Sequence, residues 1–179
     1  MPRPVFIADR SNSGTFIGLA ILLLICGSVQ IGTAQIRGAG DWTPLSEPNA
    51  YEGMPYRLMK PIDFDKSNRY PLIVSLHGGG GKGTDNRKQL KDWNKQLAEK
   101  ERRAKYPCYV LAPQANDLWN GEHLRKIQAI IKDLPAVDMD RLYILGHSMG
   151  GRLTCLVAGT DRRVKAASPS VGGSGFLQT

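Results

Sequence analysis

Cysteine and histidine are scarce in this sequence. Three of each occur among its 179 residues, and none of their spacings is typical of a metal site. The sequence therefore predicts neither a bound metal ion nor a cofactor. Repeats and low-complexity tracts are also absent, and a composition with 41% hydrophobic and 22% charged residues is that of a folded globular protein.

Long hydrophobic runs are confined to the N-terminus. An apolar run over 16–26 follows the basic residues Arg3 and Arg10, and small residues precede Gln35. This pattern predicts a signal peptide over 1–34, cleaved after Ala34, and a secreted or periplasmic protein. An uncleaved N-terminal anchor is the alternative, although the run is short of the ~20 apolar residues that a bilayer span needs.

Acidic residues are outnumbered by basic ones, 16 against 24. The densest basic stretch, 87–105, also carries acidic residues and an apolar stripe formed by Leu90, Trp93 and Leu97, as expected for a solvated amphipathic helix. We therefore expect no nucleic-acid partner. Affinity for an acidic polysaccharide or an anionic membrane surface stays open.

Only two cysteines, Cys108 and Cys155, lie outside the predicted signal peptide. They are predicted on a strand and in a helix, and these places suit buried free thiols as well as a disulfide. The sequence leaves their pairing open.

Strand and helix patterns alternate in the second half of the chain. Residues 35–55 are rich in glycine and proline and predict a linker or an irregular arm, and 56–179 predict one partial α/β domain. Such alternation with short connections predicts a parallel sheet covered on both faces. The expected strands are 56–59, 72–76, 108–112, 142–145 and 164–171, and the expected helices are 87–104, 122–134 and 149–158.

The most informative motif is Gly146-His147-Ser148-Met149-Gly150, between an expected strand and an expected helix. A serine on a sharp strand-to-helix turn is typical of a nucleophile, and the flanking glycines avoid clashes with neighbouring backbone. The helix would aim its first N–H groups, Met149 foremost, at a developing oxyanion. His147 is expected to pack rather than to act as a base.

A second glycine-rich motif follows the expected strand 72–76. His77 is followed by Gly78, Gly79, Gly80 and Gly81, which let the backbone approach a substrate oxygen closely. Gly79 is the first choice of donor. A phosphate cradle is not expected, because no Gly-Lys-Ser/Thr follows, and His77 is expected to order the loop through hydrogen bonds.

Three segments carry a resemblance to a known family. Residues 70–86 (YPLIVSLHGGGGKGTDN), 111–114 (LAPQ) with Trp119, and 137–151 (VDMDRLYILGHSMGG) resemble the phospholipase/carboxylesterase and predicted-peptidase branch of the α/β-hydrolase superfamily. This branch is also similar to polyhydroxyalkanoate depolymerase-like and feruloyl-esterase-like enzymes. The match covers about residues 56–173.

The resemblance implies a three-layer α/β-hydrolase sheet, a nucleophile at Ser148 and an oxyanion hole formed by Gly79 and Met149. It implies a small-molecule or polymer ester as substrate. It also gives Trp119 a place in the acyl or alcohol site, although a packing role is the alternative. The remaining candidate pocket residues are His77, Gly78, Gly80 and His147.

The sequence departs from the family in its catalytic triad. Family members order the triad as serine, acid and histidine along the chain, yet the segment after Ser148 contains no histidine and one acid, Asp161. We therefore expect a C-terminally truncated, incomplete sheet with little turnover. A non-catalytic protein that binds a ligand or partner in the retained pocket is the alternative. An open strand edge near 164–171 predicts self-association.

Overall fold

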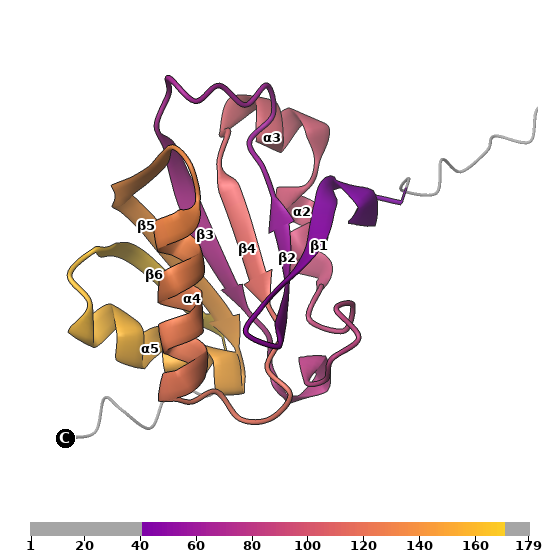
Figure 1. The fold of residues 1–179 in the computed structure, drawn as a ribbon, viewed down its shortest axis with the longest axis vertical. Helices are drawn as coiled ribbons and strands as arrows, with labels where there is room; N and C mark the ends of the chain where they lie inside the picture. Colours follow the sequence, from indigo (N-terminus) through magenta and orange to yellow (C-terminus); the bar gives the residue numbers. More distant parts are fainter. Residues whose placement is uncertain (1–40, 171–179) are drawn as a thin grey trace, which may run out of the picture. The chain divides into compact units, whose positions relative to one another are not determined.

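A six-stranded sheet forms the centre of residues 41–170, the part of the chain that this computed structural model describes (Figure 1). The strands are β1 (Ser46–Tyr51), β2 (Met54–Met59), β3 (Tyr70–Leu76), β4 (Tyr109–Pro113), β5 (Val137–His147) and β6 (Val164–Ser170). The helices are η1 (Thr43–Leu45), η2 (Gly79–Gly81), α2 (Asp92–Leu97), α3 (Lys100–Lys105), α4 (Gly121–Asp133) and α5 (Met149–Thr160), of which η1 and η2 are 3-10 turns.

The strand order is β1-β2-β4-β3-β5-β6. The last four strands in this order are parallel, as the alternating pattern predicted, whereas β1 pairs with β2 and β2 with β4 in antiparallel fashion. The α/β fold class is thus confirmed for a mixed sheet. In Figure 1 the arrows of β3 and β4 end at the bottom, so the carboxyl edge, where ligands of such sheets bind, lies there.

An N-terminal hairpin replaces part of the expected arm. The prediction of irregular structure over 35–55 is wrong for 46–51, which form β1 and pair with β2 from Ser46 to Tyr51. The turn residues Glu52 and Gly53 have φ values of 44° and 77°, as a tight two-residue hairpin requires. Pro48 is tolerated because β1 is an edge strand. The glycine and proline residues of 35–55 had led to the prediction of irregular structure in place of this strand.

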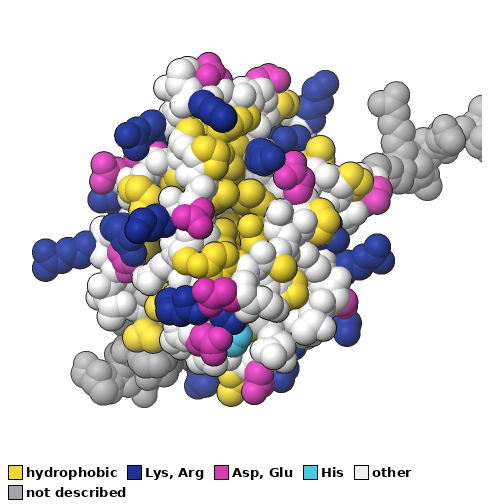
Figure 2. Space-filling view, viewed as in Figure 1, with side chains coloured by type: hydrophobic (Ala, Val, Ile, Leu, Met, Phe, Trp, Pro, Cys, Tyr) yellow, Lys and Arg dark blue, Asp and Glu magenta, His cyan; other side chains and the backbone are white. Residues whose placement is uncertain are grey.

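Helices α4 and α5 cover one face of the sheet. There Leu72, Val74 and Leu76 of β3 belong to one buried cluster with Ile127 of α4 and Leu153 of α5. Figure 1 shows α4 in front of the sheet, and in the same view hydrophobic side chains gather along the middle of the face with charged residues around them (Figure 2). Successive side chains of a strand point to opposite faces of the sheet, so the β3 side chains between Leu72, Val74 and Leu76 face the other side.

Helix α2 lies on the opposite face. The hydroxyl of Ser75 accepts hydrogen bonds from Trp93 Nε1 at 2.9 Å and from Asn94 Nδ2 at 3.0 Å. Ile73 of β3 and Leu97 of α2 both pack against the small buried cluster of Met59, Ala98 and Val110. The sheet is therefore covered on both faces, which confirms the three-layer architecture.

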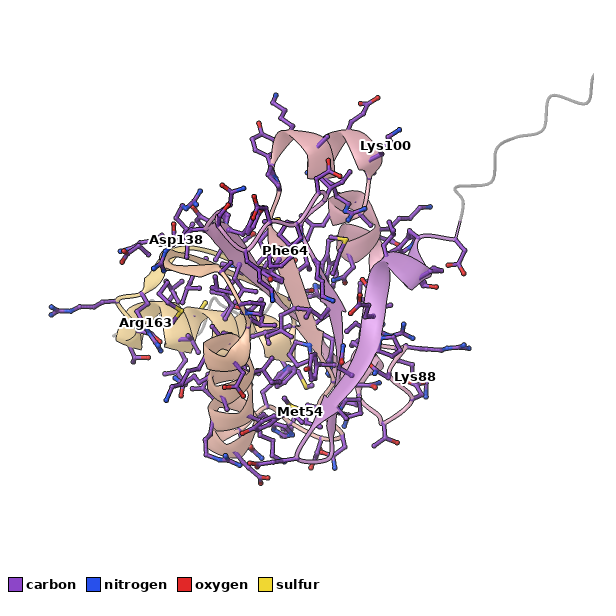
Figure 3. All side chains as sticks on the ribbon, turned by 45° about the horizontal axis from the view of Figure 1, so that its top comes forward. Met54, Phe64, Lys88, Lys100, Asp138 and Arg163 are labelled. Atoms are coloured by element: carbon purple, nitrogen blue, oxygen red, sulfur yellow. The ribbon has the colours of Figure 1, made fainter. Side chains whose placement is uncertain are left out.

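The single helix expected over 87–104 is two short helices instead. Glu99 lies between α2 and α3 with ψ 131°, an extended conformation that interrupts the helix. Helix α2 begins only at Asp92, where the side-chain oxygen of Asn94 reaches back and accepts from the Lys91 N–H at 2.9 Å. Basic side chains of this region point outward, as Lys88 and Lys100 do in Figure 3.

The C-terminal end of the described sheet is β6, which pairs with β5 alone. Residues 165–170 are exposed, whereas Val164 is partly buried. Helix α5 was expected to stop before Gly159 but runs through it to Thr160. Asp161 follows the helix and pairs with Arg163, at the end of α5 away from Ser148.

The two cysteines of the described region are free thiols, and burial raises the pKa of Cys108 to about 11. Residues 41–170 contain no helix long and apolar enough to cross a membrane and no cluster of three metal-ligating side chains. The expected signal peptide over 1–34 lies outside the described residues.

Candidate active site

Ser148 occupies a strained turn between β5 and α5. Its backbone has φ 53° and ψ −116°, a conformation that residues other than glycine rarely adopt. Backbone packing enforces the turn: a Cβ on Gly146 would lie 2.4 Å from the Gly150 oxygen, and one on Gly150 would lie 2.5 Å from the Leu76 oxygen. The two glycines let the turn sit against the end of β3.

The glycine loop after β3 lies directly beside this turn. A Cβ placed on Gly78 would be 3.0 Å from the Ser148 Cβ and 3.0 Å from the His147 oxygen. Gly79 and Gly80 open the 3-10 turn η2, which Gly81 closes by donating to the Gly78 oxygen at 2.9 Å. The fold thus brings the serine and the loop to the same carboxyl edge of the sheet.

Both sets of backbone N–H groups predicted to bind an oxyanion sit at the start of a helical turn. Met149 is the first residue of α5, and Gly79 is the first residue of η2. N–H groups in these places have no acceptor within their own helix, so they are available to a bound oxygen.

His77 is fully buried behind the glycine loop. Its Nε2 accepts from the Ala115 N–H at 3.0 Å, so Nδ1 carries the proton of the neutral ring and donates to the Gly78 oxygen at 2.7 Å. Burial lowers the pKa of His77 and keeps the ring neutral. With both nitrogens engaged, His77 orders the loop and has no nitrogen left for a serine proton.

Trp119 packs against the same histidine. Its Nε1 donates to the His77 oxygen at 3.0 Å, and the two rings lie 4.7 Å apart. The indole also meets the ring of His123 edge-on, with the ring centroids 5.6 Å apart. Trp119 therefore buttresses the glycine loop, while its predicted place in an acyl or alcohol site stays a prediction.

His147 points to the face of the sheet that carries α2. Its ring lies 6.1 Å from that of Trp93, and its Nδ1 is 3.3 Å from the Ser170 hydroxyl. It lines a shallow pocket together with Trp93, Leu145, Gly146, Ser168 and Ser170. Within residues 41–170, which include all three histidines of the sequence, no hydrogen bond joins the Ser148 hydroxyl to an imidazole.

A polar network around Asn86 was missed by the sequence analysis. The Asn86 side chain donates to the oxygens of Asn49 at 3.1 Å and Tyr56 at 3.2 Å, and its backbone oxygen accepts from Arg57 at 2.7 Å. Its N–H donates to Gln114 at 2.6 Å. No local sequence signal identifies these partners, because they lie 28 to 37 residues away along the chain.

Comparison with solved structures identifies the fold. A thermostable esterase is 32% identical with a TM-score of 0.60 over 70% of this chain and 40% of its own. An S-formylglutathione hydrolase from Staphylococcus aureus is 16% identical with a TM-score of 0.52, over 69% and 55%. A ferulic acid esterase from the anaerobic fungus Anaeromyces mucronatus is 13% identical with a TM-score of 0.51, over 68% and 56%.

These likenesses, together with the sheet order and the turn at Ser148, place the protein in the α/β-hydrolase superfamily. The chain spans between 40% and 56% of the length of these three solved structures. Comparisons with protein-family models and with curated protein sequences give no match.

Proposed function

We propose that this chain carries the nucleophile and the oxyanion hole of a serine hydrolase that cleaves carboxylic esters. The observation that carries the proposal is the strained φ of Ser148 at the head of α5, directly against Gly78. Strain of this kind is retained where the surrounding structure enforces it, and it concentrates at functional sites. The esterase at 32% identity supports esters as the substrate class.

The proposed chemistry begins with attack of the Ser148 hydroxyl oxygen on the ester carbonyl. The carbonyl oxygen gains the negative charge and receives hydrogen bonds from the N–H groups of Met149 and Gly79. The intermediate then expels the alcohol and leaves an acyl group on Ser148. Water releases the acid in a second step.

The serine proton needs an acceptor during the attack, and the contacts of the three histidines bear on this step. His77 uses both ring nitrogens behind the loop, His123 packs on Trp119, and His147 faces Trp93. We therefore propose that these imidazoles do not serve Ser148 and that turnover by the 179-residue chain alone is slow. Loss of a triad costs about 10⁶ in kcat in a related system.

These histidine contacts favour a second candidate function. A site with a nucleophile and oxyanion donors but no base would bind an ester, an acid or a partner without turnover. In both readings the glycine loop and Met149 bind an oxygen. Only the hydrolase reading requires the Ser148 hydroxyl to react.

The deciding experiment compares the wild type with Ser148→Ala on p-nitrophenyl acetate and adds labelling by a fluorophosphonate. The slow-turnover proposal expects a rate little above background and a small effect of the substitution, because loss of a triad costs about 10⁶ in kcat. Stoichiometric labelling of Ser148 with a fast rate that the variant loses would show that a base reaches the serine. Binding of a carboxylate product without any labelling would support the second candidate.

We also propose that residues 1–34 direct secretion. The run of apolar residues after Arg3 and Arg10 supports this. N-terminal sequencing of the mature protein is expected to begin at Gln35, and a mature protein that retains Met1 would contradict it.

A further inference from the structure

Gln114 ends the sequence LAPQ just after β4 and is 1% exposed. Its Oε1 accepts from the Asn86 N–H at 2.6 Å, and its Nε2 donates to the Gly81 oxygen at 3.0 Å and to Asp85 Oδ1 at 2.8 Å. A single buried amide thus holds three points of the loop that begins at Gly78.

The residues that follow Gln114 extend these contacts. Ala115 donates to the His77 ring, and its oxygen accepts from the Gly83 N–H at 3.1 Å. Trp119 donates to the His77 oxygen. The segment 114–119 therefore contacts the loop over 77–86 from one end to the other, through side chains and backbone alike.

The loop itself supplies little order. Four consecutive glycines, 78–81, have the least conformational preference of any residue type. Their backbone-to-backbone hydrogen bonds are the two of the η2 turn, from Gly81 to Gly78 and from Lys82 to Gly79, and their other partners are the side chains of His77, Lys91 and Gln114. Oxyanion donors act only when they are held in place before the reaction, within about 0.5 Å of the productive geometry.

We propose that Gln114 is a positioning residue, which holds the glycine loop against the Ser148 turn so that the loop N–H groups are aligned for a substrate oxygen. It acts through Gly81, Asp85 and Asn86 and does not itself touch the reacting atoms. The catalytic part of this inference rests on the proposed ester hydrolysis. The clamping of the loop does not.

The first arm of the test measures amide hydrogen exchange in the full chain by mass spectrometry. Gln114→Met keeps the volume and removes all three hydrogen bonds. Gln89→Met is the matched control, because Gln89 is equally buried but bonds only to Asn86 Oδ1. We expect exchange in peptides over 77–86 to rise about 10-fold in Gln114→Met, with the rest of the sheet unchanged and the control close to wild type.

The second arm measures the Ser148-dependent part of p-nitrophenyl acetate hydrolysis. Gln114→Met is expected to lower kcat about 10- to 100-fold with KM within about 2-fold, since misplaced donors cost transition-state stabilisation and not ground-state binding. Gln114→Glu is expected to lose more at pH 8 than at pH 5, because only the protonated acid can donate to Gly81 or Asp85. This pH profile distinguishes a lost donor from a destabilised core.

The two arms test the holding of the glycine loop by Gln114, here called the clamp, separately from the proposed ester hydrolysis. If the wild type shows no Ser148-dependent hydrolysis, the second candidate function, binding without turnover, is favoured over ester hydrolysis, and the exchange arm alone decides whether Gln114 holds the loop. Wild-type exchange over 77–86 in Gln114→Met, an equal rise throughout the domain, or the same effect in Gln89→Met would each overturn it.

Discussion

Gly146 and Gly150 approach each other backbone to backbone, so that a Cβ on Gly146 would lie 2.4 Å from the Gly150 carbonyl oxygen. No real Cβ tolerates that distance, and the obstacle is backbone that cannot rotate away. Gly146→Ala is therefore expected to lower the free energy of unfolding by about 3 kcal/mol, measured by chemical denaturation. Gly79→Ala is the control, because a Cβ there meets nothing within 4 Å. Equal losses in the two variants would contradict the packing at the turn.

The strain at Ser148 predicts an unusual ranking of its variants. At φ 53° and ψ −116° glycine is accommodated and alanine is strained like serine. We expect Ser148→Gly to be more stable than Ser148→Ala by about 1 kcal/mol, against the usual order in which glycine is the less stable. Thermal unfolding of the two variants checks this. Alanine as the more stable residue would mean that the turn relaxes without the serine.

The buried neutral ring of His77 predicts a loss of stability in mild acid. Its folded-state pKa lies below the ordinary value of 6.5, so the unfolded chain takes up a proton that the folded chain does not. This stability is present above pH 6.5 and is lost as the pH falls below it, at no more than about 1.4 kcal/mol per pH unit for one proton. Urea titrations between pH 7 and pH 5 measure the slope.

The free energy of unfolding should depend less on pH between pH 7 and pH 5 in His77→Gln than in the wild type. The pKa of His123 is also lowered, chiefly by burial, so His123→Gln serves as the comparison and should retain the part that belongs to His77. A slope that depends on His123 alone would assign the acid sensitivity to the start of α4.

The exposed edge at β6 predicts self-association. Residues 165–170 are exposed, and among the strands described over 41–170 β6 pairs with β5 alone, so its outer side offers backbone groups to another chain. We expect the sedimentation coefficient to rise with concentration, and we expect Ala166→Lys to reduce that rise, because a charged side chain on an edge strand opposes pairing. Ala50→Lys on β1, at the other edge, carries the same charge and should have less effect. A monomer at all concentrations would rule out this edge as an interface.

Local sequence signals predicted the parts of the site that are contiguous in the chain. The turn at Ser148 could be predicted between a strand and a helix because three signals coincide in the sequence. These are the apolar run before the turn, Gly146 and Gly150 around it, and the helical pattern after it. The burial of α4 on one side follows likewise from the spacing of Ile127, Ile130 and Ile131. The α/β class followed from the order of such segments.

Contacts between distant segments could not be predicted in the same way. The role of Gln114 depends on three partners that the fold brings to it from 28 to 33 residues away. The split of the helix over 87–104 follows from the extended backbone of Glu99, and β1 needed β2 to become a strand. For Gln114 and β1, tertiary pairing outweighed local propensity.

The bonds of Asn86 to Asn49 and Tyr56 have a practical consequence for any shortened version of the protein. A fragment that starts after the hairpin would begin at a plausible strand, β3, and would still contain every residue of the Ser148 turn. It would nevertheless lose the acceptors of the Asn86 side chain and the guanidinium of Arg57, and so release the loop that faces the serine. The smallest fragment suitable for biochemistry therefore begins before Ser46, about one hundred residues upstream of the nucleophile it is meant to preserve.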